Sequence, residues 1–222
     1  IVMITGGSGT IGFTIAKAFS KLGAQTIIVD KDEPSLKKAV NSLGTGHEYL
    51  TLDVTSPEAA EQAMLGSIQK FGGLDILISN AGAAHAGSML SISEDDLRGA
   101  FELNFFSHYS FATAAAKVFQ NQNRGGQILF NISKQAVNPG KNFGAYGLPK
   151  ATTFFLMKQL ALELGSKGIR VNGVNADRIR SGLLTDDFIS SRAKSRSVSE
   201  ADYMAGNLLN KEVTAEHVAD AF

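Results

Sequence analysis

The sequence predicts an α/β protein: a Rossmann-type, doubly wound parallel sheet in three α/β/α layers, folded as a single domain. Apolar, strand-like runs alternate with helical patterns along the chain. The first run breaks into glycines before a helix, and the second ends on an acidic residue. Strands separated by helices form parallel sheets that helices cover on both faces. At 222 residues, one domain is the default.

The elements follow one another in a regular order. Strand-like runs lie at 1–4, 25–30, 48–52, 74–79, 126–132 and 169–174, and helical patterns lie at 10–22, 34–42, 57–70, 94–120 and 146–165. Residues 176–210 differ, because they are polar and rich in Ser, Arg and Asp. Ligands of open α/β sheets bind beyond the carboxyl ends of the strands, so we expect this segment to form a substrate lid.

A glycine-rich turn follows the first strand. Gly7, Gly9 and Gly12 fit the G-x-G-x-x-G spacing, which allows a tight turn, close approach to a pyrophosphate and close packing of helix on strand. Backbone N–H groups at the start of the helix then face the phosphates. The expected phosphate-binding residues are Gly6, Gly7, Ser8, Gly9, Thr10, Ile11 and Gly12.

An acidic residue stands where a dinucleotide site needs one. Asp30 ends the second strand, eighteen residues after Gly12. A carboxylate there accepts hydrogen bonds from both ribose hydroxyls of an adenosine and repels a 2′-phosphate. The sequence therefore predicts NAD as the cofactor, with NADP less favoured, although the neighbouring Lys31 partly offsets the charge.

Tyr146 and Lys150 are the candidate catalytic pair. Residues i and i+4 share a helix face, so the phenol and the ammonium influence each other. A tyrosine that works near neutral pH needs its pKa lowered from ~10 by up to ~3 pH units, and a neighbouring cation favours phenolate. Such pairs also occur by chance in many helices. The dinucleotide-binding turn favours the catalytic interpretation.

Several motifs in this order resemble the short-chain dehydrogenase/reductase family. They are T-G-G-S-G-T-I-G at 5–12, L-D-V at 52–54, S-N-A-G at 79–82, L-N at 103–104, Ser133, Y-G-L-P-K at 146–150 and G-I-R-V-N at 168–172. The resemblance covers residues 1 to about 185. It implies the doubly wound fold, a nicotinamide cofactor, a small alcohol or carbonyl substrate, and assembly into a homodimer or homotetramer.

The resemblance also implies roles for individual residues. Tyr146 exchanges a proton with the substrate oxygen, Ser133 hydrogen-bonds that oxygen, and Lys150 binds the nicotinamide ribose and lowers the tyrosine pKa. Asn104 supports a water-linked proton relay. The implied adenosine-side contacts are Asp53, Val54, Asn80, Ala81 and Gly82.

The chain departs from the family pattern at three places. Thr10 replaces the middle glycine of the first motif, although the G-x-G-x-x-G spacing survives. Pro149 precedes Lys150, and proline is tolerated in a first helical turn, so we expect the helix to begin close to Tyr146 or to bend there. Ala176 and Asp177 replace the usual Pro-Gly.

The third departure affects the candidate substrate end. Ser181 takes the place of a threonine that contacts the cofactor carboxamide, and it keeps the hydroxyl. Asp177, Arg178 and Arg180 add charge there. Either these charges pair with one another in a solvated loop, or an arginine grips an anionic or polyhydroxylated substrate.

Composition restricts the partners. Acidic and basic residues balance at 21 each, which gives no indication of a nucleic-acid or anionic-membrane partner. There is no cysteine, and the histidines at 47, 85, 108 and 217 lack ligand-like spacing, so we expect no metal site. His85 is a candidate substrate contact, and the others are expected at the surface or partly buried. No long apolar stretch is present, which favours a cytoplasmic protein.

The sequence leads to one main functional hypothesis and two alternatives. We expect an NAD-dependent oxidoreductase that acts on a small alcohol or carbonyl compound. A non-catalytic dinucleotide sensor is the first alternative. The second follows from a chain that opens inside a strand and stops in a helix-like pattern, which indicates a fragment that is inactive alone. Residues 175–185 also resemble the dehydrogenase half of bifunctional aldolase/short-chain dehydrogenases, which implies sugar-derived substrates.

Overall fold

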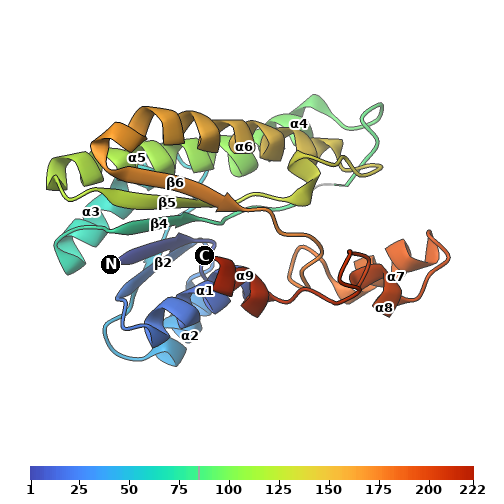
Figure 1. The fold of residues 1–222 in the computed structure, drawn as a ribbon, viewed down its shortest axis with the longest axis horizontal. Helices are drawn as coiled ribbons and strands as arrows, with labels where there is room; N and C mark the ends of the chain where they lie inside the picture. The colour runs from blue at the N-terminus through green and yellow to red at the C-terminus, as the bar shows by residue number, and fades with distance from the viewer. Residues whose placement is uncertain (85) are drawn as a thin grey trace.

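The protein forms one six-stranded parallel sheet, seen in a computed structural model that describes residues 1–84 and 86–222 (Figure 1). The strand order is β3-β2-β1-β4-β5-β6, and every neighbouring pair runs parallel. The strands are β1 (Val2–Thr5), β2 (Thr26–Asp30), β3 (Glu48–Thr51), β4 (Ile76–Ser79), β5 (Gly126–Asn131) and β6 (Ile169–Val174). The predicted fold class is confirmed. The strand order reverses between β1 and β4, where doubly wound sheets bind ligands.

Helices cover both faces of this sheet (Figure 1). They are α1 (Thr10–Lys21), α2 (Glu33–Leu43), α3 (Ala59–Phe71), α4 (Glu94–Phe101), α5 (Ser107–Gln122), α6 (Gly144–Leu164), α7 (Asp186–Lys194), α8 (Glu200–Met204) and α9 (Ala215–Ala221). Short helical turns complete the described chain: η1 (Glu102–Phe106), η2 (Lys134–Ala136) and η3 (Gly165–Lys167).

Alternation along the strands creates two separate cores. Met3 of β1 points into a cluster with residues of α3, α5 and α6, whereas Val2 and Ile4 point into a cluster with residues of α1, α2 and α9. Successive strand side chains face opposite sides of a sheet, so a strand with consecutive apolar side chains requires helices on both faces. The whole of β1 is buried for this reason.

The predicted helix at 94–120 is interrupted. A π-helical segment, η1, separates α4 from α5. Asn104 lies inside it, where its side-chain Nδ2 donates to the carbonyl oxygens of Ala100 (3.1 Å) and Ala83 (3.0 Å). The extra residue per turn redirects Asn104 from the helix surface into the protein, as π segments often do at functional sites.

Helix α6 begins close to Tyr146, as expected, but the expected first-turn position of Pro149 was wrong. The helix begins at Gly144, so Pro149 lies in its second turn rather than its first. The missing N–H leaves the carbonyl of Ala145 without its helical donor. Pro149 is buried, and Tyr146 occupies the first turn with Lys150 one turn later.

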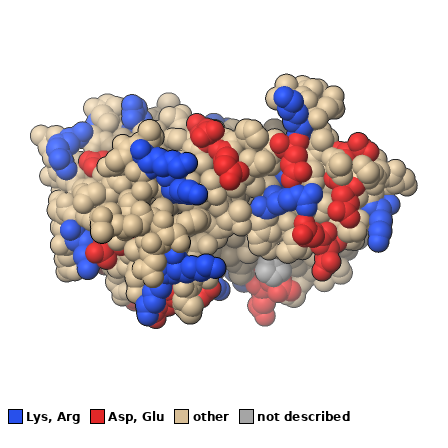
Figure 2. All heavy atoms as spheres, turned by 90° about the horizontal axis from the view of Figure 1, so that it is seen from below, with Lys and Arg blue, Asp and Glu red and all other residues tan. Residues whose placement is uncertain are grey.

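Residues 176–210 lie beyond the carboxyl ends of the strands, at the end of the molecule marked by α7 and α8 (Figure 1). They contain a small core of their own, formed by Leu184, Ile189, Ala193, Tyr203 and Met204. Seen from below in Figure 2, acidic and basic side chains are interspersed over the surface. Among the described residues, no helix is both long and apolar enough to cross a membrane.

Candidate active site

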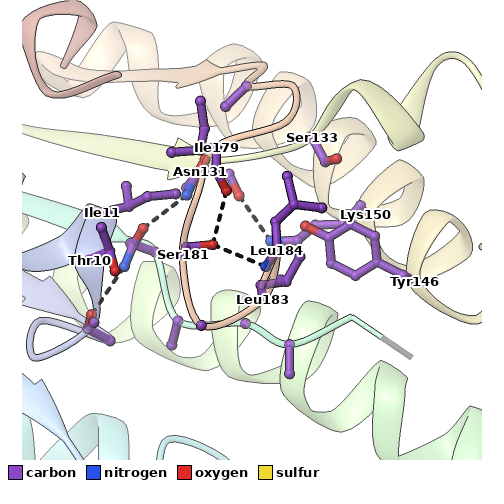
Figure 3. A pocket seen from close by; sticks show the side chains of 18 of the residues that line it. Thr10, Ile11, Asn131, Ser133, Tyr146, Lys150, Ile179, Ser181, Leu183 and Leu184 are labelled. Carbon is purple, nitrogen blue, oxygen red and sulfur yellow. Dashed lines mark hydrogen bonds between the residues drawn. The ribbon is translucent and has the colours of Figure 1, made fainter. Parts of the chain in front are cut away.

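An elongated cavity of about 600 Å³ opens at the carboxyl ends of the strands. This volume is typical of small-molecule and cofactor sites. The predicted residues that line it are Gly6, Gly9, Thr10, Ile11, Gly12, Asp30, Asp53, Val54, Asn80, Ala81, Gly82, Ser133, Tyr146, Lys150 and Ser181 (Figure 3). Gly7, Ser8 and Asn104 are absent from this lining. The cavity therefore connects the glycine-rich turn to the candidate catalytic residues.

The glycine-rich turn is closely packed at two glycines and open at a third. Gly6 has φ +63°, a left-handed conformation that favours glycine. A Cβ on Gly12 would lie 2.2 Å from the carbonyl oxygen of Gly6, and a Cβ on Gly7 would lie 2.5 Å from Cβ of Ile28. At Gly9, a Cβ would meet only the Gly6 oxygen, at 3.5 Å, so this glycine faces open space. Gly7 and Gly12 thus pack the turn, and Gly9 exposes backbone to the cavity.

Asp30 is joined to this turn. Its Oδ2 accepts a hydrogen bond from the Ser8 hydroxyl (2.6 Å) and a longer one from the Ser8 backbone N–H (3.3 Å), and its Oδ1 accepts from the backbone N–H of Lys31 (2.8 Å). Ser8 therefore acts on the site by fixing the carboxylate. The arrangement places a negative charge at the end of β2, beside the glycine-rich turn.

The next two strands end in further polar residues. Asn80, after β4, donates from Nδ2 to the Thr5 carbonyl (2.9 Å) and accepts at Oδ1 from Nδ2 of Asn131 (2.9 Å). Asp53 accepts two hydrogen bonds from Thr55, which hold the pKa of its carboxyl below the usual value. These contacts tie neighbouring loops together and keep Asp53 ionised.

Ser133, Tyr146 and Lys150 meet at the other part of the cavity, where Figure 3 shows the phenol beside the lysine and Ser133 nearby. Lys150 Nζ lies 5.8 Å from the centre of the Tyr146 ring. Burial raises the pKa of Tyr146, and hydrogen bonding with the Ser133 hydroxyl acts in the opposite direction. In the protein alone, the tyrosine pKa therefore moves opposite to the predicted lowering, because desolvation outweighs the favourable contacts.

The charge of Lys150 does little to lower the pKa of Tyr146. Its side chain is fully enclosed, and burial lowers its pKa from 10.5 to about 7. Near neutral pH the amine is thus only partly charged. Nζ donates to the backbone carbonyl of Asn131 (2.9 Å), which fixes its position at the end of β5.

His108 is a buried residue of the site that the sequence reasoning missed. Its Nε2 lies 3.3 Å from Lys150 Nζ, and its Nδ1 lies 2.6 Å from the Ser79 hydroxyl. Burial and the Lys150 charge hold the pKa of His108 well below its usual value, while a hydrogen bond to the Ala81 backbone acts in the opposite direction. The ring is therefore neutral. Its position on the inward face of the helix, four residues after Asn104, was the available signal.

The other histidines are less informative. His47 hydrogen-bonds with Ser20 (2.9 Å) and Thr26 (2.9 Å), away from the cavity. His217 caps the start of α9. The candidate substrate contact His85 lies outside the described residues. Among the described residues, no group of His, Asp and Glu side chains is arranged to hold a metal ion.

Asn104 lies outside the cavity lining, next to Gly82. Its side chain is fully buried, its Oδ1 lacks a hydrogen-bond partner, and its backbone oxygen accepts from the Thr153 hydroxyl (2.7 Å). A Cβ on Gly82 would lie 2.8 Å from Asn104 Oδ1 and 3.5 Å from Lys150 Nζ. The small residue at 82 thus leaves a narrow gap between an unpaired acceptor and the lysine amine.

The charged residues after β6 pair largely with one another. Asp177 forms an ion pair with Lys134 (2.8 Å), next to Ser133. Arg178 donates to the backbone oxygens of Tyr203 (2.6 Å) and Gly206 (3.0 Å). Arg180 pairs with Asp186 (2.6 Å) and Glu212 (2.7 Å) and is absent from the cavity lining. The structure therefore favours pairing of these charges within the protein over binding of a substrate by Arg178 or Arg180.

Ser181 lines the cavity but also stabilises its own loop. Its hydroxyl donates to the Ile179 carbonyl (3.1 Å) and accepts a long hydrogen bond from the Leu184 N–H (3.4 Å), as the dashed lines in Figure 3 mark. One lone pair of the hydroxyl remains for a ligand in the cavity.

Comparison with known proteins agrees with this geometry. A family model described as short chain dehydrogenase matches residues 1–189. The (+)-borneol dehydrogenase 1 of Salvia officinalis is 31% identical over 225 residues, which cover 100% of this chain and 84% of that protein. The crystal structure of gox2181 superposes with a TM-score of 0.90 at 25% identity, covering 99% of this chain and 85% of that one.

A bacterial relative differs in length. The uncharacterized oxidoreductase YuxG of Bacillus subtilis (strain 168) is 32% identical over 187 residues, which cover 82% of this chain but 27% of that protein. The chain thus spans about a quarter of YuxG. The family match over residues 1–189 and the strand order lead to one conclusion. The chain belongs to the short-chain dehydrogenases, a family of nicotinamide-dependent oxidoreductases.

Proposed function

We propose that the protein is an NAD-dependent oxidoreductase that interconverts a small alcohol and its carbonyl compound. The observation that carries the proposal is that Ser133, Tyr146 and Lys150 line the same cavity as Asp30 and the glycine-rich turn. Proton-transfer groups and a dinucleotide-sized site are thus continuous. The bound nicotinamide would accept or supply the hydride.

Residues of the chain itself would transfer the proton. Reduction of a carbonyl develops negative charge on its oxygen, so donors aimed at that oxygen stabilise the transition state. We assign Tyr146 as the proton donor or acceptor and Ser133 as the second hydroxyl on the same oxygen. Lys150 would bind the nicotinamide ribose and, when charged, favour the phenolate. Asn104, across the gap at Gly82, would support proton movement to the lysine.

The preference for NAD rests on Asp30. The carboxylate is held by Ser8 at the end of β2 and has capacity left to accept from ribose hydroxyls, whereas a 2′-phosphate would meet its charge. Asp53, Val54, Asn80, Ala81 and Gly82 would line the adenosine side. The Gly6–Gly12 turn would hold the pyrophosphate, with Gly9 at the closest approach and Ser181 near the carboxamide.

Residues 176–210 would act as the substrate lid, because several of them line the cavity over the catalytic residues. We keep the sugar-derived substrates of the bifunctional resemblance as candidates. A cytoplasmic location and a homodimer or homotetramer remain predictions.

The test is a titration of the purified protein with NADH and with NADPH, followed by nicotinamide fluorescence, together with turnover assays on small hydroxyaldehydes, sugars and hydroxyketones. Tighter binding of NADH with turnover of at least one compound supports the proposal. Tight NADH binding without turnover would favour the sensor or the inactive fragment. Failure to bind either cofactor would contradict the proposed site.

A further inference from the structure

The substrate end of the cavity contains more positive than negative charge. Besides the catalytic candidate Lys150, the charged residues that line it there are the cations Lys134, Arg178, Arg192 and Arg196 and the single carboxylate Asp177. Four cations and one carboxylate leave an excess of three positive charges. Lys134 and Asp177 neutralise each other, and Arg178 is held by backbone oxygens, so Arg192 and Arg196 account for the cations without a described carboxylate partner.

Arg192 is positioned by aromatic rings rather than by an acid. Its guanidinium carbon lies 5.3 Å from the Phe143 ring centre and 6.0 Å from that of Phe188, and the two rings meet edge to face at 5.9 Å. Aromatic faces hold a guanidinium without occupying its N–H groups. The rings thus position the guanidinium without a carboxylate partner among the described residues.

One of these donors is buried and unpaired. Among the residues that the structure describes, only two buried side-chain polar atoms lack a hydrogen-bond partner: Oδ1 of Asn104 and Nε of Arg192. Buried N–H groups are nearly always paired, so an orphan in the wall of a ligand cavity indicates a group that a ligand completes. Nε together with Nη forms the edge of the guanidinium that binds carboxylate or phosphate bidentately.

The position of Arg192 indicates an interaction with the substrate rather than with the cofactor. Phe143, under the Arg192 guanidinium, is the N-cap of α6 and lies three residues before Tyr146, on the side of the proton-transfer groups. The pyrophosphate turn is built from β1 and α1, at the other part of the cavity. Arg196 stands near Tyr203, 5.2 Å from its ring centre, and adds a second cation from the same lid.

From this geometry we infer that Arg192, assisted by Arg196, forms a binding subsite for an anionic group of the substrate, a carboxylate or a phosphate ester. The inference rests on the proposed oxidoreductase function and narrows its substrate class to small hydroxy or carbonyl compounds that carry one such group. Arg192 thus takes the role considered for Arg178 and Arg180, whose guanidinium groups are already bonded to other residues of the protein.

Three carbonyl compounds with the same methyl-ketone end test the subsite: hydroxyacetone, which is neutral, pyruvate, which carries a carboxylate, and hydroxyacetone phosphate. Binding is measured by NADH fluorescence on the NADH-loaded Tyr146→Phe protein, so that no turnover occurs. Pyruvate or the phosphate ester binds at least about tenfold tighter than hydroxyacetone, as expected for a bidentate charged contact. Which of the two binds tighter identifies the anion.

Arg192→Met keeps an unbranched apolar side chain against Phe143 and Phe188. It reduces the preference for the charged compound about tenfold or more and leaves hydroxyacetone and NADH binding within twofold. Arg192→Lys, which keeps the charge but lacks the fork, restores part of the preference. Arg196→Met, at an exposed position, lowers the preference by a smaller factor. The matched control is Lys194→Met, which removes an exposed cation from α7 outside the cavity lining and changes neither affinity.

Three results overturn the inference. One is an equal or absent affinity of the parent for charged and neutral compounds. Another is an unchanged preference in both Arg192→Met and Arg196→Met. The third is a loss of NADH affinity in Arg192→Met, which would assign the arginine to the cofactor phosphates. Calorimetric titration with pyruvate in the absence of NADH measures the subsite even if NADH fails to bind. Failure of NADH to bind would contradict the proposed function and not the subsite.

Discussion

Lys150 Nζ lies 3.3 Å from Nε2 of His108, inside the protein and beneath the candidate active site. The amine thus has a buried imidazole on one side and the Asn131 carbonyl, at 2.9 Å, on another. In the tautomer that carries its proton on Nδ1, the neutral imidazole accepts from the ammonium at Nε2 and favours the charged form of the lysine, which burial disfavours. The contact therefore makes His108 a positioning residue for Lys150.

Replacement of His108 by Leu should shift the pH profile of turnover. Loss of the acceptor removes a hydrogen bond to a charged donor, a contribution of about 1.5–3 kcal/mol, so the pKa of Lys150 falls by about 1–2 pH units. The pH above which kcat declines then moves down by the same amount. His108→Gln, which keeps an acceptor, should lie closer to the parent. A uniform loss of kcat with an unchanged profile in both variants would indicate a packing role only.

The pKa of Lys150 also predicts a pH-dependent stability. The folded pKa is about 7 and the exposed value is 10.5. Between these values the unfolded chain binds more protons, so the free energy of unfolding rises with pH from about 7 towards 10.5, by at most about 1.4 kcal/mol per pH unit. The cost of burying the charge is fully present below pH 7.

Urea unfolding of the parent and Lys150→Met at pH 6.5, 7.5, 8.5 and 9.5 measures this difference. The variant should be the more stable of the two at pH 6.5, and its advantage should shrink as the pH rises. Lys117→Met, which removes an exposed lysine of α5, serves as the control with a constant offset. Parallel curves for the parent and Lys150→Met would show that the folded lysine keeps an ordinary pKa.

Asp30→Asn should reduce the discrimination between the two cofactors. The substitution keeps an acceptor for Ser8 but removes the charge that disfavours a 2′-phosphate. We expect the ratio of the NADPH and NADH dissociation constants to narrow about tenfold or more, mainly through tighter NADPH binding. Ser8→Ala, which keeps the charge and frees the carboxylate, should weaken NADH binding with a smaller change in the ratio. An unaltered ratio in Asp30→Asn would remove Asp30 from the specificity role.

The parallel sheet and the glycine-rich turn were predictable because their signals are local. Val2, Met3 and Ile4 are consecutive apolar residues of a buried strand, and helices must cover both of its faces, so periodicity alone specifies the layers. The order of the motifs also brought Ser133, Tyr146 and Lys150 to one cavity, as expected.

The features that the sequence did not reveal depend on contacts between distant segments. The π segment at Asn104 has an ordinary helical pattern and is recognised only by its bonds to Ala83 and Ala100. His108 resembles any polar helix residue until α6 places Lys150 against it. Similarly, Arg178 and Arg192 both belong to the polar segment 176–210, and only the tertiary structure shows that Arg178 is hydrogen-bonded while Nε of Arg192 is not.

Turnover and NADH binding, compared between the parent and Tyr146→Phe, test the central claim most directly. Phenylalanine fills the same buried space and removes only the hydroxyl, so loss of the proton-transfer group should lower kcat about 10²–10⁴-fold. The dissociation constant of NADH should stay within twofold, because the cofactor's phosphate and ribose contacts come from other residues. Activity retained in Tyr146→Phe, with NADH still bound, would contradict the assignment of Tyr146 as the proton donor.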